Sequence, residues 1–161
     1  HDDLRSMVEW HGIPYFHVPV DPKDKAPAFA EVERLVKAHQ ADVIVLARYM
    51  QILSPRMCEA LSGRCINIHH SFLPSFKGAK PYHQAHERGV KLIGATAHYV
   101  TSNLDEGPII EQEVSRVDHA MSPDDLVAIG RDVESVVLAR AVRLHIEMRT
   151  MVHGRRVIVF R

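Results

Sequence analysis

The pattern of hydrophobic and polar positions changes along this chain. Some segments have helical periodicity, and others are the apolar runs typical of strands. Residues 27–39 carry apolar side chains every three or four positions, which predicts an amphipathic helix. Residues 42–47 and 64–69 are instead nearly continuous apolar runs, the pattern of strands covered on both faces. The same reasoning predicts further strands over residues 15–20, 91–100, 109–117 and 157–160.

Capping residues mark where the other helices begin and end. Ser54-Pro55 predicts a helix over 55–61, and Ser122-Pro123 with two following acids predicts one from 123 to about 150. Gly12 predicts the end of a helix over 4–11. A short helix is also predicted over residues 81–88. The long last helix is expected to bury Leu126, Ile129, Val133, Val137, Leu144 and Met148.

This alternation of strands and helices predicts an α/β fold with a Rossmann-like, doubly wound and mostly parallel sheet. Ligands of such sheets bind at the carboxyl ends of the strands. Three segments lie just past predicted strand ends, at 47–53, 69–74 and 100–107. One cleft is therefore expected to receive all three.

Polar side chains at one of these strand ends suggest acid–base chemistry. Asn67 and His69 share a face because side chains alternate along a strand. The amide can donate to an oxyanion, the imidazole can carry a proton, and Asp105 from a separate loop can orient the imidazole. Taken alone, the Asn-x-His pair favours a plainer interpretation, in which both side chains satisfy backbone groups at a strand end.

Composition narrows the class of protein. A length of 161 residues and a hydrophobic fraction of 46% fit one domain with its own core. Lys+Arg and Asp+Glu balance at 20 each, which gives no basis for a nucleic acid or membrane partner. Two cysteines favour a reducing, cytoplasmic location over a disulfide framework. His83 and His86 lack the further ligands of a metal site, so no metal is expected.

Three motifs in fixed order carry a family resemblance: CINIHHSFLPSFKG at 65–78, GATAHYV at 94–100 and LDEGP at 104–108. Together they resemble the folate-dependent formyltransferase superfamily, and its deformylases in particular. The resemblance implies the formyltransferase fold and hydrolysis of 10-formyltetrahydrofolate to tetrahydrofolate and formate. It also implies a role in one-carbon metabolism and purine biosynthesis, no tightly bound cofactor or metal, a small-molecule folate substrate, and a homo-oligomer.

The resemblance also assigns roles to residues. It implies that Asn67, His69 and Asp105 are catalytic, with His70 and His98 supporting them. It places the pterin pocket along 47–53, although the residues alone favour a plain strand-to-helix loop there. The residues expected to line this pocket are Arg48, Tyr49, Met50, Leu53, Val100, Thr101 and Leu104.

Two alternatives to the hydrolase stay open. An amine formyltransferase, such as glycinamide ribonucleotide formyltransferase, would use the same three residues, but such transferases commonly have Pro where His70 stands. An inactive folate-binding fragment is the other alternative. Relative to the superfamily, residues 1–161 resemble a catalytic domain without its first strand-helix-strand and without the regulatory ACT domain, so the chain is expected to be truncated at its N-terminus.

Overall fold

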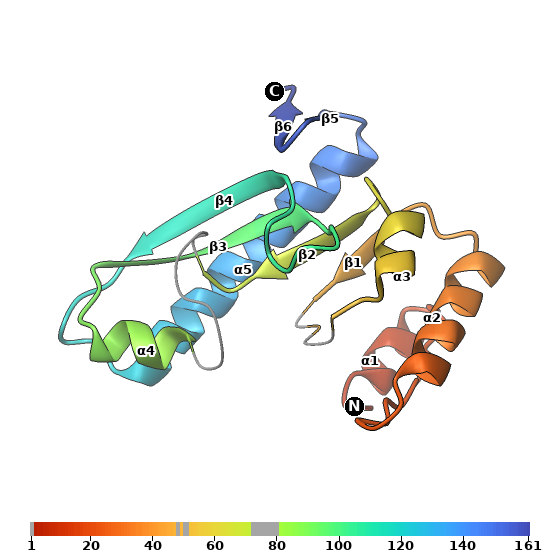
Figure 1. Cartoon of the computed structure of the whole chain (residues 1–161). Helices are drawn as coiled ribbons and strands as arrows, with labels where there is room; N and C mark the ends of the chain where they lie inside the picture. Colours follow the sequence, from red (N-terminus) through yellow and green to blue (C-terminus); the bar gives the residue numbers. More distant parts are fainter. Residues whose placement is uncertain (1, 48, 50–51, 72–80) are drawn as a thin grey trace. The chain divides into compact units, whose positions relative to one another are not determined.

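A computed structural model describes residues 2–47, 49, 52–71 and 81–161 (Figure 1). The chain forms two compact units, residues 1–41 and residues 42–161. The candidate site described below lies in the second unit.

The first unit contains two helices, α1 (Arg5–Trp10) and α2 (Ala26–Ala38). Both helices agree with the sequence pattern. The Arg5 guanidinium lies 4.8 Å from the centre of the Tyr15 ring. The strand predicted over 15–20 is wrong, because these residues are in irregular structure. A strand needs a neighbour for its backbone groups, and residues 2–41 contain no other extended segment that pairs with it.

A four-stranded sheet organises the second unit, in the order β1 (Ile44–Leu46), β2 (Cys65–His69), β3 (Leu92–Tyr99) and β4 (Ile109–Arg116). β1 and β2 are parallel, whereas the β2–β3 and β3–β4 pairs are antiparallel. The predicted α/β class is confirmed, but the sheet is mixed where a mostly parallel one was expected. The loop between β3 and β4, residues 100–108, is too short for a crossover connection, so these two strands are joined as a hairpin.

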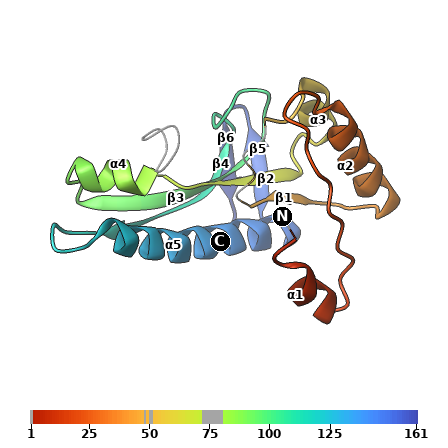
Figure 2. The same cartoon turned by 90° about the horizontal axis from the view of Figure 1, so that it is seen from below.

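Helices α3 (Pro55–Ala60), α4 (Pro81–Glu87) and α5 (Pro123–Ile146) complete the second unit. The Ser54 and Ser122 caps are present, and each hydroxyl accepts a backbone N–H three residues on. Figure 2 shows α5 running along one face of the sheet. Its Val137 and Ala141 are fully buried against β2 and β3, together with Ile66, Ile68, Ala95, Ala97 and Tyr99.

The end of α5 differs from the prediction. The helix stops at Ile146, where Met148 takes a left-handed conformation (φ +56°) and the amide of Arg149 donates to the carbonyl of Leu144. This Schellman-type bond ends a helix in place of a further turn. Met148 is therefore 86% exposed instead of buried. The chain continues into a separate hairpin of β5 (Thr150–His153) and β6 (Arg156–Val159), so residues 157–160 do not add an edge strand to the main sheet.

Candidate active site

The candidate site begins on one face of β2 and β3. Asn67 lies directly opposite His98 in the antiparallel register, and His69 lies opposite Thr96. Alternation along β2 turns Ile66 into the core beneath α5, leaving Asn67 and His69 on the other face. A β-bulge between Ala97 and His98 breaks the β3–β4 register at this point, as bulges often do beside functional sites.

Asp105 comes from the loop that joins β3 to β4. Its backbone is left-handed (φ +55°), a conformation that Asp tolerates better than most residues. The base of the loop is closed by a 2.9 Å hydrogen bond from the Tyr99 amide to the Pro108 carbonyl. Gly107 is buried there, and a Cβ on it would clash with the carbonyl oxygen of Tyr99. The loop is thus tightly packed against β3, which sets where Asp105 stands.

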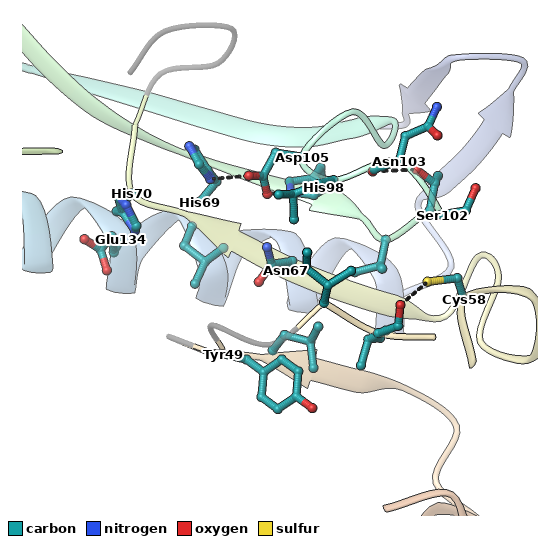
Figure 3. Close-up of a pocket in the computed structure, with 17 residues that line it drawn as sticks. Tyr49, Cys58, Asn67, His69, His70, His98, Ser102, Asn103, Asp105 and Glu134 are labelled. Atoms are coloured by element: carbon teal, nitrogen blue, oxygen red, sulfur yellow. Dashed lines mark hydrogen bonds and ion pairs between the residues drawn. The ribbon is translucent and has the colours of Figure 1, made fainter. Parts of the chain in front are cut away.

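The Asp105 carboxylate faces two imidazoles (Figure 3). Its Oδ2 lies 3.3 Å from Nδ1 of His69, and its Oδ1 lies 3.7 Å from Nε2 of His98. His98 also places Nδ1 at 2.9 Å from the carbonyl oxygen of Tyr99. Because a carbonyl oxygen only accepts, Nδ1 of His98 carries a proton.

The electrostatics of this cluster favour a charged Asp105. Interactions with His69, and then with His98, hold the pKa of the Asp105 carboxyl well below its usual range, against the opposing effect of burial. The carboxylate in turn selects the His69 tautomer with the proton on Nδ1. Nε2 of His69 then bears the lone pair, and it is buried without a hydrogen bond from the described residues. His69 is therefore arranged to accept a proton at Nε2.

A cavity of about 330 Å³ opens in front of these side chains. That volume is within the range of small-molecule sites. Asn67, His69, His98 and Asp105 all line it. So do the described residues that were expected to bind folate, namely Tyr49, Leu53, Val100, Thr101 and Leu104. Arg48 and Met50, also expected there, lie outside the described residues.

His70, expected to support the catalytic side chains, faces the same cavity as His69, although strict alternation along a strand would turn it away. Its ring stacks on that of His69, with centroids 5.1 Å apart and planes inclined by 16°, and it lines the same cavity. The reason is that β2 ends at His69, so strict alternation of faces no longer applies to the next residue.

Several cavity residues were missed from the sequence. Glu134 of α5 is the most notable, because it is an acid within a buried stripe whose other members are apolar or small. That anomaly was visible in the helical pattern. Cys58 also lines the cavity, near Cys65, whose thiol has its pKa raised to about 12 chiefly by burial. Neither cysteine is in a disulfide.

Thr96 secures the chain just after the two histidines. Its fully buried hydroxyl donates to the carbonyl of Ser71 at 3.0 Å and accepts from the Gln112 amide at 2.9 Å. Within the described part of the chain, no group of three or more His, Cys, Asp or Glu could hold a metal ion. No helix among these residues is long and apolar enough to span a membrane.

Comparison with known proteins identifies the family to which the chain belongs. The model of the formyl transferase family matches residues 6–142, which is most of the chain. The chain belongs to the formyl transferase family. Membership of the formyltransferase superfamily, expected from the three motifs, is confirmed, and with it the fold class.

Named relatives within the formyl transferase family fall into two groups. A formyltetrahydrofolate deformylase of Corynebacterium is 57% identical over the whole chain, and the chain covers 56% of it. A crystal structure of a Pseudomonas syringae deformylase superposes with a TM-score of 0.97 at 68% identity, covering 100% of this chain and 54% of that one. A glycinamide ribonucleotide transformylase of Symbiobacterium toebii gives a TM-score of 0.87 at 33% identity, covering 97% and 74%. The chain spans about half the length of the curated relatives it matches.

The lowered pKa of Asp105 predicts a pH dependence of stability in this formyl transferase domain. The carboxyl binds its proton more weakly when folded than when unfolded, so its contribution is complete above the unfolded pKa of about 4 and is lost as pH falls through the lower folded value. Asp105→Asn should therefore reduce the acid sensitivity of the free energy of unfolding below pH 5. Urea unfolding between pH 3 and 7 measures this.

The control for the pH series is Asp132→Asn, which neutralises an exposed carboxylate of α5. It should leave the acid sensitivity of the wild type in place. Equal pH profiles for wild type and Asp105→Asn would show that the carboxylate is not held ionised by the two imidazoles.

Proposed function

We propose that this chain carries the catalytic site for hydrolysis of 10-formyltetrahydrofolate to tetrahydrofolate and formate. The observation that carries the proposal is the His69–Asp105 pair, 3.3 Å apart, beside Asn67 in one cavity. Support also comes from relatives named formyltetrahydrofolate deformylase, which are 49–57% identical to the chain.

The mechanism follows from the proton positions. Asp105 holds the proton of His69 on Nδ1, and Nε2 takes a proton from a water molecule as that water attacks the formyl carbon. The carbonyl oxygen becomes an oxyanion, which accepts a hydrogen bond from the side-chain NH₂ of Asn67. His69, now an imidazolium facing the Asp105 carboxylate, returns the proton to N10 of the folate. The C–N10 bond breaks, releasing tetrahydrofolate and formate.

The rest of the cavity suits a folate. A flat heterocycle needs an apolar slot with a few polar groups, and Tyr49, Leu53, Val100 and Leu104 supply apolar surface next to the catalytic side chains. Burial raises the pKa of the Tyr49 phenol, so Tyr49 remains a neutral wall of the slot. The cytoplasmic location, the homo-oligomer and the lack of a tightly bound cofactor stay predictions.

Formate release tests the proposal. The protein at its full natural length, given 10-formyltetrahydrofolate and no amine, should release formate and tetrahydrofolate in equal amounts. An enzyme-coupled formate assay together with the absorbance of tetrahydrofolate measures both products. If folate binds but no formate is released, and the formyl group is found on the amine once glycinamide ribonucleotide is added, the chain is a transferase like the 33%-identical relative. Binding without either product would indicate an inactive folate-binding protein.

A further inference from the structure

Glu134 is a buried carboxylate that the hydrolytic mechanism does not use. It lies on α5, is 7% exposed, and lines the same cavity as His69 and His70. The hydroxyl of Tyr82, which is also 7% exposed, donates to its Oε1 at 2.7 Å. Burying a carboxylate is costly unless hydrogen bonds compensate, so a buried acid facing a reactive cavity calls for an explanation.

The contact between Tyr82 and Glu134 depends on a glycine. Gly130 stands one helical turn before Glu134, and a Cβ on it would clash with the Tyr82 ring. The ring of this α4 residue therefore lies directly against the backbone of α5, which lets the phenol hydroxyl reach the carboxylate. Tyr82, Gly130 and Glu134 form one packed unit, called here the Tyr82–Glu134 wall.

The Tyr82–Glu134 wall lies behind His70. The ring centroids of His70 and Tyr82 are 6.5 Å apart, and the ring of His69 stacks on that of His70. In Figure 3, His70 and Glu134 lie together at the end of the cavity that is away from Asp105. The imidazole of His69 thus has the Asp105 carboxylate at its Nδ1 edge and the ring of His70 stacked on its face, and Tyr82 of the wall is the next aromatic ring beyond His70.

We propose that Tyr82 and Glu134 are positioning residues that act through His70 to close this end of the cavity, so that it admits water but not an amine. The inference rests on the proposed hydrolysis. Water needs little space and few hydrogen-bond partners, whereas an amine acceptor brings substituents that must fit beside the formyl group. With water, the new bond joins oxygen to the formyl carbon and formate leaves. With an amine, nitrogen takes that place and a formamide forms instead.

The ratio of formate to N-formylglycinamide tests the proposed role of the Tyr82–Glu134 wall. The protein at full length is given 10-formyltetrahydrofolate and an excess of glycinamide, and formate and N-formylglycinamide are quantified by mass spectrometry. We expect formate alone from the wild type. Tyr82→Phe keeps the ring but removes the hydroxyl that donates to Glu134, and it should lower kcat for formate release about tenfold by misplacing His70, with KM nearly unchanged. Glu134→Ala opens the space and should produce N-formylglycinamide.

Two control variants separate positioning from general stability. Tyr99→Phe removes another buried hydroxyl, one that hydrogen-bonds His145 and Thr150 away from the cavity, both at 2.8 Å. It should lower the thermal midpoint while keeping the kcat and product ratio of the wild type. Glu134→Gln keeps the size of the side chain and an oxygen that accepts from Tyr82, so it should retain formate as the sole product.

The outcomes distinguish this inference from the proposed function. If the wild type binds folate but releases no formate, the hydrolase proposal fails, and the inference fails with it. If the wild type releases formate while folded Tyr82→Phe keeps its kcat and product ratio, only the inference fails. Identical behaviour of Tyr82→Phe and Tyr99→Phe would likewise overturn it. A folded Glu134→Ala protein that still gives formate alone would overturn the exclusion of the amine, and Tyr82→Phe, which removes a single oxygen, tests the positioning of His70 even if Glu134→Ala does not fold.

Discussion

Asp105→Asn should reduce kcat for formate release by about a thousandfold while folate binding is retained. The asparagine side chain has the same shape but no charge. It no longer stabilises the imidazolium of His69 that forms when water is deprotonated, and its NH₂ group favours the wrong tautomer of the neutral ring. Both effects act on the chemical step, whereas the lining of the cavity is mostly apolar, so the substitution should change folate binding little.

Single-turnover kinetics and equilibrium binding of tetrahydrofolate measure the two quantities separately. Asp132→Asn, on the exposed side of α5, serves as the matched control and should leave both unchanged. A folded Asp105→Asn protein with more than about a tenth of the wild-type kcat would be incompatible with the proposed His69–Asp105 pair, since general acid–base catalysis of this kind contributes about a hundredfold or more.

Local sequence patterns predicted most of the secondary structure, because capping side chains and apolar runs act within a few residues of where they occur. Ser54 and Ser122 cap helices with their own side chains, and the apolar run of β2 could be buried on both faces. The errors arose where a non-local partner decides the outcome. Residues 15–20 have strand-like composition but no strand beside them within residues 2–41, and the Schellman bond at Met148 could not be seen from helical periodicity.

The same difference between local signals and non-local partners applies to the candidate site. Asn67 and His69 could be paired from strand alternation, and the family motif supplied Asp105, which now lies 3.3 Å from His69. The stacking of His70 on His69 was not predictable, because it depends on the backbone turning where β2 ends. Glu134 is sixty-four residues beyond His70 (134 − 70), and only the packing of α4 against α5 shows why an acid occurs in an apolar stripe.

Gly107→Ala should be the most damaging conservative substitution in the loop that carries Asp105. The position is buried, and the added methyl group would overlap the carbonyl oxygen of Tyr99 and lie 3.1 Å from Nδ1 of His98. Backbone cannot move aside as a flexible side chain does, so the loop itself must shift. We expect a loss of about 3 kcal/mol in the free energy of unfolding, as for other overpacked sites. The fall in kcat should be larger than the loss of folded protein alone explains, because the shift displaces Asp105 from His69.

Gly154→Ala is the matched control, since it separates steric overlap from backbone preference. Gly154 is in the β5–β6 turn at φ +59°, and a Cβ there would meet no atom within 4 Å. Alanine at that position should cost only about 1 kcal/mol for the left-handed conformation and should leave kcat unchanged. Urea unfolding and formate release on both variants give the comparison. If Gly107→Ala loses no more stability than Gly154→Ala and keeps its kcat, then the close packing of the loop on Tyr99 does not hold Asp105 in place. In that case its carboxylate must be positioned by its contacts with His69 and His98 alone.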